Sequence, residues 1–318
     1  MDGQKKAAFT AVVGRPSVGK STLVNRLCGE KVAIVSPVPQ TTRNAIRGIV
    51  NREAGQIVFV DTPGRHKSEK KFNRKLLSVS DRSMEEADLI LYVLDASRPP
   101  AGEEEAIAAR ILPLADRLVA GVNKIDAPGA DFEEALTFLR DKIPALKRER
   151  IFQVSALKNR GLGELLDCLF HLAPWGEPFY PADFYTDQGV QFRIAEIIRE
   201  KAVARLREEL PHSIYVDVAD MEFRDGPSGD TGDGAPAGEY RGAPPRRRLW
   251  VRAFIAVERE SQKGMVVGKG GQTIKAIRQA ARKDLDRIFD WKIELDLRVK
   301  TARDWRHNDT LLKRLIER

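Results

Sequence analysis

One segment constrains the fold of this chain more than any other. Residues 14–21, GRPSVGKS, follow a short apolar run and precede a helical pattern. Gly14 and Gly19 let the backbone curl so that its N–H groups point inward at phosphate oxygens. Lys20 adds a positive charge, and the Ser21 hydroxyl can ligate Mg²⁺. A strand, this loop and a helix in succession predict a phosphate-binding loop at the carboxyl end of a sheet strand.

The rest of the first half supports such a sheet. Predicted strands are the short apolar runs at residues 9–13, 45–50, 56–60, 89–95, 118–122 and 151–154. Predicted helices between them are the amphipathic patterns at residues 103–112, 132–140 and 162–172. This alternation predicts an α/β domain over residues 1–175, with an open, mainly parallel sheet and helices on both faces.

Three further motifs stand at predicted strand ends. In DTPG, residues 61–64, Asp61 can hold Mg²⁺ through water and the Gly64 N–H can sense a γ-phosphate. In NKID, residues 123–126, the Asp126 carboxylate can accept hydrogen bonds from the guanine N1–H and 2-amino groups. Adenine lacks this donor pair. Ser155 and Ala156 can offer a backbone N–H to guanine O6. Together the motifs predict a guanine-nucleotide site.

A second domain follows a break in the pattern. Residues 173–183 hold three prolines and a glycine, and we interpret residues 176–187 as a linker. The expected elements of residues 188–318 are a helix, two strands, a helix, a strand and a helix, at 191–210, 213–222, 249–258, 273–288, 292–299 and 309–318. This order predicts a smaller α+β domain. Residues 224–245, rich in Gly, Pro, Asp and Ser, are interpreted as a passive low-complexity loop.

The excess positive charge lies at the end of the chain. Residues 246–318 hold 20 Lys and Arg against 10 Asp and Glu, whereas the remainder holds 34 against 36. A concentrated basic segment favours a polyanion partner, with nucleic acid ahead of an anionic membrane; the alternative is a solvated basic face. The loop Gly268-Lys269-Gly270-Gly271 is a G-x-x-G, whose small residues let a nucleic-acid backbone approach closely.

The compartment follows from cysteine usage and hydropathy. Cys28 and Cys168 form neither a disulfide framework nor a zinc motif, which is typical of a reducing cytosol. The start of the chain shows no signal-peptide pattern. The longest apolar run, residues 89–94, has six residues, against the about 20 that a membrane helix needs.

The ordered set GRPSVGKS, DTPG, NKID and VSA resembles the translation-factor class of P-loop GTPases. QTTRN, residues 40–44, resembles their first switch, in which Thr42, rather than Thr41, matches the threonine that closes on Mg²⁺ and the γ-phosphate. With a following domain whose G-x-x-G and element order resemble a type II KH domain, nearly the whole chain is similar to the Era family of bacterial GTPases. EIIREK at residues 196–201 and VERESQKGMVVGKGG at residues 257–271 extend the resemblance.

The Era resemblance implies a GTPase that binds the 3′ region of small-subunit ribosomal RNA and assists assembly of that subunit. It implies Mg²⁺ with the nucleotide, a monomer, and a cytoplasmic protein with possible peripheral association with the inner membrane. Slow intrinsic hydrolysis is expected because no glutamine follows DTPG to orient water. Two alternatives stay open: a membrane-associated regulatory GTPase, and an RNA-binding module whose nucleotide site does not hydrolyse.

The motifs and the resemblance together assign the site residues. Nucleotide contacts are expected at Gly14, Arg15, Pro16, Ser17, Val18, Gly19, Lys20, Ser21, Thr22, Asp61, Thr62, Pro63, Gly64, Asn123, Lys124, Asp126, Ser155 and Ala156. The expected catalytic residues are Lys20, Thr42 and Gly64, and the expected Mg²⁺ ligands are Ser21, Thr42 and Asp61. RNA contacts are expected at Lys263, Gly268, Lys269, Gly270 and Gly271. Ser17 stands where many relatives carry the asparagine associated with potassium-stimulated hydrolysis.

Overall fold

The structure, a computed structural model, describes residues 5–36, 38, 44–61, 83–207, 210–224, 247–308 and 312. Its internal contacts divide the chain into two compact units. The first comprises the described residues up to Gln188 together with those from Arg306 onward, and the second spans Gly189–Trp305.

A six-stranded sheet forms the centre of the first unit. Its strands are β1 (Lys6–Val13), β2 (Ile46–Arg52), β3 (Gly55–Asp61), β4 (Leu89–Asp95), β5 (Leu118–Asn123) and β6 (Ile151–Gln153). Their order is β2-β3-β1-β4-β5-β6, and every pair is parallel except the antiparallel β2 and β3. Every residue of β3 and β4 is buried, as expected of strands covered on both faces. The predicted mainly parallel sheet is confirmed.

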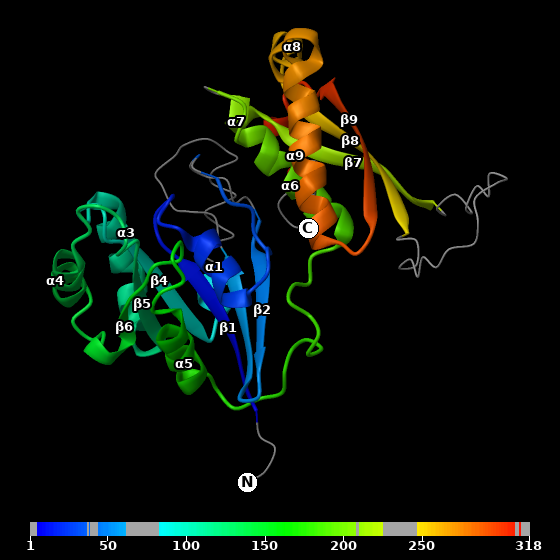
Figure 1. Cartoon of the computed structure of the whole chain (residues 1–318). Helices are drawn as coiled ribbons and strands as arrows, with labels where there is room; N and C mark the ends of the chain where they lie inside the picture. Colours follow the sequence, from blue (N-terminus) through cyan, green and yellow to red (C-terminus); the bar gives the residue numbers. More distant parts are fainter. Residues whose placement is uncertain are drawn as a thin grey trace. The chain divides into compact units, whose positions relative to one another are not determined.

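Helices cover both faces of this sheet (Figure 1). They are α1 (Lys20–Cys28), α3 (Gly102–Ile111), α4 (Phe132–Lys142) and α5 (Leu162–Leu172). Ile107 of α3 and Leu139 of α4 join Tyr92 in one buried apolar cluster. On the opposite face, Leu165 of α5 packs against Gly121 and α1 packs against β2 and β3. The loops that leave the carboxyl ends of β1, β3, β4 and β5 therefore meet at one edge.

The segment 174–188, which includes the predicted linker, is bound along the first unit. The fully buried side chain of Gln56 on β3 holds it. Gln56 Nε2 donates to the Tyr180 carbonyl at 2.9 Å, and Gln56 Oε1 accepts from the backbone N–H groups of Phe179 at 2.9 Å and Tyr180 at 3.0 Å. One buried amide thus satisfies three backbone groups of this segment.

The same segment continues along the outer edge of β2. The Ile49 N–H donates to the Tyr185 carbonyl at 2.9 Å. Arg47 Nη1 donates to Asp187 Oδ2 at 2.7 Å. Since an edge strand with unpaired N–H and C=O groups invites pairing with other chains, the segment 174–188 protects β2.

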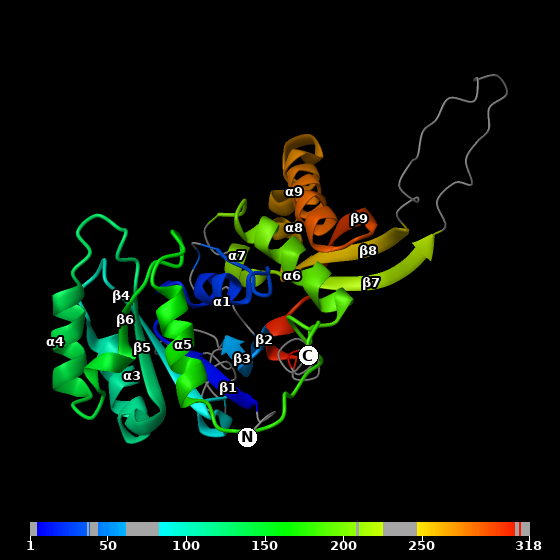
Figure 2. The ribbon, with the colours of Figure 1, turned by 60° about the horizontal axis from the view of Figure 1, so that its bottom comes forward.

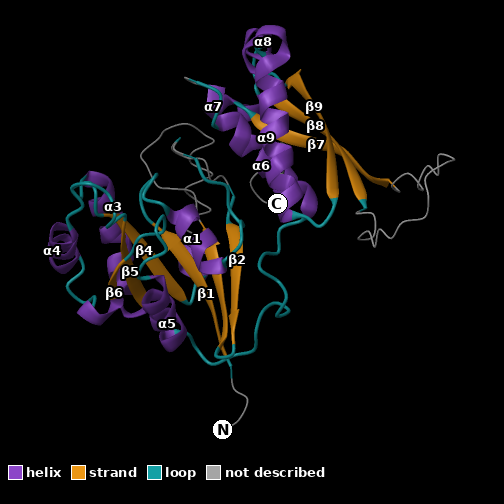
Figure 3. Ribbon diagram, in the orientation of Figure 1, coloured by secondary structure: helices purple, strands orange, loops and turns teal. Residues whose placement is uncertain are grey.

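A three-stranded sheet organises the second unit (Figure 2). Its elements are α6 (Val190–Val203), α7 (Leu210–Ser213), β7 (Tyr215–Arg224), β8 (Arg248–Val257), α8 (Glu260–Val267), α9 (Gln272–Ile288) and β9 (Lys292–Thr301). β8 lies in the middle, antiparallel to β7 and parallel to β9. Alternate residues of β8, such as Val251 and Ala253, are buried, and α6 and α9 pack against the flanking strands β7 and β9. The predicted α+β domain is confirmed (Figure 3).

Two elements of the second unit differ from the sequence prediction. The helix expected over residues 191–210 ends at Val203. Leu206 is buried although it lies beyond the helix end, so its apolar side chain made the helical pattern look longer than the helix is. α8 was not predicted, because Val266 is its one buried residue and no apolar stripe marks it. Most of the predicted loop, residues 225–245, and the predicted helix at 309–318, except position 312, lie outside the described residues.

Among the described residues, no helix has the length and apolar character to cross a bilayer.

Replacing Gln56 with Ala should release the segment 174–188. The backbone groups of Phe179 and Tyr180 lose their partners, so the free energy of unfolding should fall by about 2–4 kcal/mol. Chymotrypsin should then cut the aromatic-rich segment faster than in the wild type. Gln153→Ala, which removes an exposed side chain from β6, is the control. Equal cleavage rates in both variants would show that Gln56 does not hold the segment.

Candidate functional site

The phosphate-binding loop predicted at residues 14–21 connects β1 to α1. Gly14 has φ 153°, and a Cβ there would lie 2.4 Å from the Val93 carbonyl oxygen. Gly19 has φ 100°, and a Cβ there would lie 2.5 Å from Asn123 Nδ2. Both positions require glycine, because larger residues meet backbone or a neighbouring loop.

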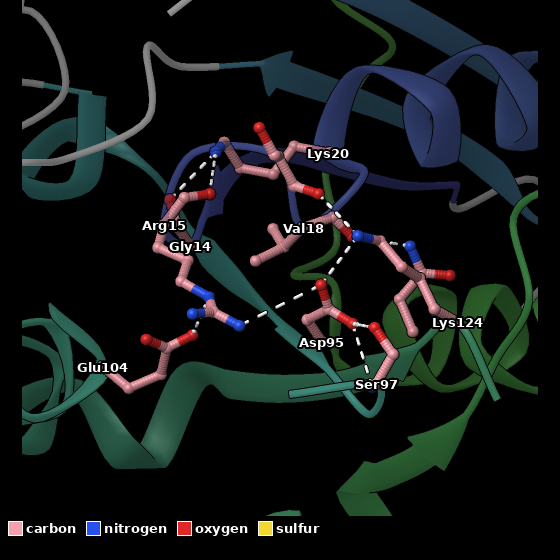
Figure 4. Close-up of polar contacts among 10 residues, drawn as sticks. Gly14, Arg15, Val18, Lys20, Asp95, Ser97, Glu104 and Lys124 are labelled. Atoms are coloured by element: carbon pink, nitrogen blue, oxygen red, sulfur yellow. Dashed lines mark hydrogen bonds and ion pairs between the residues drawn. The ribbon is translucent and has the colours of Figure 1, made fainter. Parts of the chain in front are cut away.

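Lys20 lies under this loop and is 7% exposed. Its Nζ donates to the carbonyl oxygens of Gly14 at 2.9 Å and Arg15 at 3.0 Å (Figure 4). Burial lowers the pKa of Lys20 to about 8, and the carboxylates of Asp61 and Glu104 oppose the shift. The loop is thus folded around the buried Lys20 side chain.

Asp61 and Ser21, two of the three expected Mg²⁺ ligands, lie side by side. Ser21 Oγ donates to Asp61 Oδ2 at 2.6 Å, and Asp61 is fully buried at the end of β3. Burial raises the pKa of Asp61 to about 6, against the opposing effects of Lys20 and Ser21. Asp61 Oδ1 has no hydrogen-bond partner among the described residues. A buried carboxylate oxygen with spare capacity beside a hydroxyl fits a hard cation such as Mg²⁺.

Asn123 and Lys124, at the end of β5, tie the NKID loop to the phosphate-binding loop. Asn123 Nδ2 donates to the Val18 carbonyl at 2.8 Å, and its Oδ1 accepts from the Ala156 N–H at 3.0 Å. Lys124 Nζ donates to the Ser17 carbonyl at 2.7 Å. The structure therefore brings three predicted segments together around the side chain of Asn123.

Asp126 and Ser155 lie side by side at the other end of this arrangement. Ser155 Oγ donates to Asp126 Oδ1 and also accepts from the Lys158 N–H at 2.9 Å. Ser155 is buried, and it also pairs through its backbone with Arg160. These contacts hold the half-buried Asp126 carboxylate in place.

The remaining predicted contacts divide into two groups. Pro16, Ser17 and Thr22 lie in the loop and the first turn of α1, with Ser17 at φ 65°. Thr42, Thr62, Pro63 and Gly64 lie outside the described residues.

Sequence reasoning missed three polar residues near the phosphate-binding loop, namely Asp95, Ser97 and Glu104. The available signal was that Asp95 ends β4, between β1 and β5, at the edge where the other motifs stand. Glu104 gave no such signal, because it is one of three consecutive glutamates at the start of α3.

The G-x-x-G loop lies between α8 and α9 in the second unit. Gly268 has φ 75°, and a Cβ there would lie 2.1 Å from Thr273 Oγ1. Gly270 and Gly271 also have positive φ, and no atom lies near their Cβ positions. Lys269 is exposed, whereas Lys263 on α8 pairs with Glu260 at 3.2 Å. The loop therefore presents bare backbone and one exposed cation.

A groove of about 590 Å³ lies in the same unit. It is lined by four basic side chains, two carboxylates and an aromatic ring, among others: Arg224, Arg278, Arg282, Lys292, Glu294, Asp296 and Trp250. Arginine, lysine and an aromatic ring are the side chains that contact nucleic-acid phosphates and bases. Sequence reasoning did not single out these residues.

Two family models match the chain. A model described as "50S ribosome-binding GTPase" matches residues 9–124, and a KH domain model matches residues 237–306.

Relatives are similar over nearly the full length. GTPase Era of Treponema denticola is 46% identical over 309 residues, covering 97% of this chain and 99% of that protein. GTPase Era of Borreliella burgdorferi strain ZS7 is 42% identical, covering 98% and 99%. A crystal structure of Era with MgGDPNP and nucleotides 1506–1542 of 16S ribosomal RNA matches with a TM-score of 0.85 and 35% identity, covering 98% of both chains. A crystal structure of a variant of Aquifex aeolicus Era bound to GDP·AlF4⁻ matches with the same TM-score, identity and coverage.

Phosphate binding should become linked to proton uptake above pH 8. Lys20 has a pKa of about 8, and phosphates favour its charged form. Below this pH the ammonium is already present; above it, binding of GDP must recruit a proton, so affinity falls as the pH rises. Calorimetry in two buffers with different ionisation heats should show more uptake at about pH 8.5 than at about pH 7. Equal uptake at both values would contradict the assignment of Lys20.

Proposed function

The chain belongs to the GTPase Era family, and we propose that it couples a GTP cycle on the first unit to recognition of small-subunit ribosomal RNA by the second. The nucleotide-binding part of this proposal rests on the contacts of the Asn123 side chain, which joins the phosphate-binding loop to the loop of Ala156. With Asp126 held by Ser155 on the same side, one site can receive phosphates at one end and a guanine base at the other.

Mg²⁺ would be held at the phosphate end. Ser21 Oγ and the Asp61 carboxylate are the ligands that the described residues supply, the latter directly or through water. We assign Thr42 as a further ligand from the resemblance of its segment to a first switch. When bound, the ion would neutralise charge on the β- and γ-phosphates.

Hydrolysis would be assisted mainly by charge and position. Lys20 is placed by two carbonyl oxygens, so its ammonium needs no rearrangement to meet phosphate oxygens. The Gly64 N–H is assigned to the γ-phosphate. No glutamine follows DTPG in the sequence, so we expect slow turnover without RNA or the ribosome.

RNA recognition is assigned to the second unit. The positive φ of Gly268, Gly270 and Gly271 and the exposed Lys269 suit the close approach of a sugar–phosphate backbone. The Era structure that contains nucleotides 1506–1542 of 16S ribosomal RNA supports the 3′ region as the target. By the same relationship we propose a role in assembly of the small ribosomal subunit.

Membrane association is tested by flotation with liposomes, with and without competing RNA.

Asp126→Asn should exchange guanine for xanthine preference. The amide cannot accept both guanine donors, but it can donate to the 2-keto group of xanthine. The substitution should slow phosphate release from GTP and speed phosphate release from xanthosine triphosphate, both measured with Mg²⁺. If wild-type protein releases no phosphate from GTP, the site is not hydrolytic. If both nucleotides respond alike to the substitution, Asp126 does not read the base.

Replacing both Lys269 and Gly270 with Asp should abolish RNA binding and leave GTP affinity within about twofold of wild type. Two carboxylates would repel the phosphates that this loop must approach. Wild-type RNA affinity should also fall steeply with salt, because Lys and Arg contacts release counterions. RNA and GTP titrations of the same variant measure both effects. Unchanged RNA binding would place the RNA site elsewhere, and a parallel loss of GTP affinity would indicate misfolding.

A further inference from the structure

Two buried carboxylates outside the sequence motifs connect the loops of the nucleotide site. Asp95 ends β4, and Glu104 lies in the first turn of α3. The side chain of each is 2% exposed. They contact two cations from the motifs, Arg15 of the phosphate-binding loop and Lys124 of the NKID loop (Figure 4).

Asp95 uses both carboxylate oxygens. Its Oδ2 accepts from Lys124 Nζ at 2.7 Å, and its Oδ1 accepts from the Ser97 N–H at 3.0 Å and Ser97 Oγ at 2.6 Å. Burial raises the pKa of Asp95, but the hydrogen bonds from Lys124 and Ser97 outweigh it, so the pKa lies below the ordinary value. Asp95 is therefore a fixed negative charge beside Lys124.

Glu104 is the main counterion of Arg15. Arg15 Nε lies 2.8 Å from Glu104 Oε1, whereas Arg15 Nη2 lies 4.0 Å from Asp95 Oδ2. The side chain of Arg15 is 13% exposed, and its Nη2 has no hydrogen-bond partner among the described residues. Arg15 thus points into the protein at α3 (Figure 4). Without Glu104, the ion pair left to this guanidinium among the described residues would be the longer one to Asp95.

Backbone carbonyl oxygens of the phosphate-binding loop accept hydrogen bonds from two lysines of the site. The Arg15 carbonyl accepts from Lys20 Nζ at 3.0 Å, and the Ser17 carbonyl accepts from Lys124 Nζ at 2.7 Å. Fixing the Arg15 side chain therefore fixes an acceptor of Lys20. Fixing Lys124 sets the separation between the phosphate-binding loop and the NKID loop.

We propose that Glu104 and Asp95 are positioning residues of the nucleotide site: Glu104 acts through Arg15 on the phosphate end, and Asp95 acts through Lys124 on the spacing between phosphate and base ends. The inference rests on the guanine-nucleotide site proposed above. It gives the two residues different signatures, because Glu104 is ion-paired with Arg15 of the phosphate-binding loop, whereas Asp95 is also ion-paired with Lys124 of the loop that carries Asp126.

The first test compares Glu104→Gln with Glu105→Gln. Glu105 lies on the same helix, where its 57% exposed side chain pairs with Lys142 at 2.9 Å, so its loss should leave nucleotide affinity unchanged. Glu104→Gln leaves the Arg15 charge without its main counterion, and the dissociation constants of both GDP and GTP should rise by about tenfold or more. The turnover rate at saturating GTP should change much less. If Glu104→Gln lowers the melting temperature but binds GTP as Glu105→Gln does, the role is structural only and the proposal is wrong.

The second test uses inosine triphosphate, which lacks the 2-amino group that Asp126 is proposed to read. Glu104→Gln should weaken GTP and inosine triphosphate by the same factor, leaving their affinity ratio at the wild-type value. Asp95→Asn should weaken GTP more than inosine triphosphate and so reduce this ratio. An unchanged ratio in Asp95→Asn, or a reduced ratio in Glu104→Gln, would overturn the division of roles.

A double variant separates coupling from poor folding. Arg15→Met with Glu104→Gln removes both charges, so no buried ion is left alone. It should bind GTP more tightly than Glu104→Gln, although it carries one more substitution. Binding as weak as the product of the two single effects would show that Glu104 does not act through Arg15. Failure of the wild type to bind GTP would contradict the proposed function, whereas equal binding by wild type and Glu104→Gln contradicts this inference alone.

Discussion

Two adjacent side chains at the end of β5 fix the distance between the loops that we assign to opposite ends of a nucleotide. Asn123 and Lys124 donate to the carbonyl oxygens of Val18 and Ser17, at 2.8 Å and 2.7 Å. Because these acceptors are backbone atoms of the phosphate-binding loop, the contacts need no ligand to form. They depend on the parallel sheet, which delivers the ends of β1, β4 and β5 to one edge.

Sequence alone predicts the features that one local pattern determines. The glycines of the phosphate-binding loop, the strand before it and the residues of NKID are each readable, because backbone curvature or hydrogen-bond chemistry demands those residue types. Glu104 could not be found in this way. It resembles its exposed neighbours in sequence, and its burial at 2% depends on how α3 packs against Arg15. Likewise, Pro and Gly in residues 173–183 indicate a linker, but they do not show that Gln56 binds it.

The candidate nucleotide site of the first unit pairs its buried cations with carboxylates, whereas the G-x-x-G loop and α9 of the second unit present exposed cations. Arg15 and Lys124 are paired with Glu104 and Asp95, and Lys20 and Asp61 are the charges that we assign to the phosphates and Mg²⁺. In the second unit, Lys269, Arg278 and Lys275 are exposed around the G-x-x-G loop and α9. Buried, paired charges give a fixed geometry, and exposed cations suit a partner whose phosphates are spread along a backbone. The two kinds of site match the two proposed ligands.

The central claim is that the nucleotide on the first unit controls RNA binding by the second. The most direct test is the affinity of the whole protein for RNA of the small-subunit 3′ region, measured with a non-hydrolysable GTP analogue and with GDP. The account predicts that RNA binds more tightly in the GTP-analogue state than in the GDP state. By linkage, RNA should then raise the affinity for the analogue, relative to the affinity for GDP, by the same factor. The same RNA affinity in both nucleotide states would contradict it.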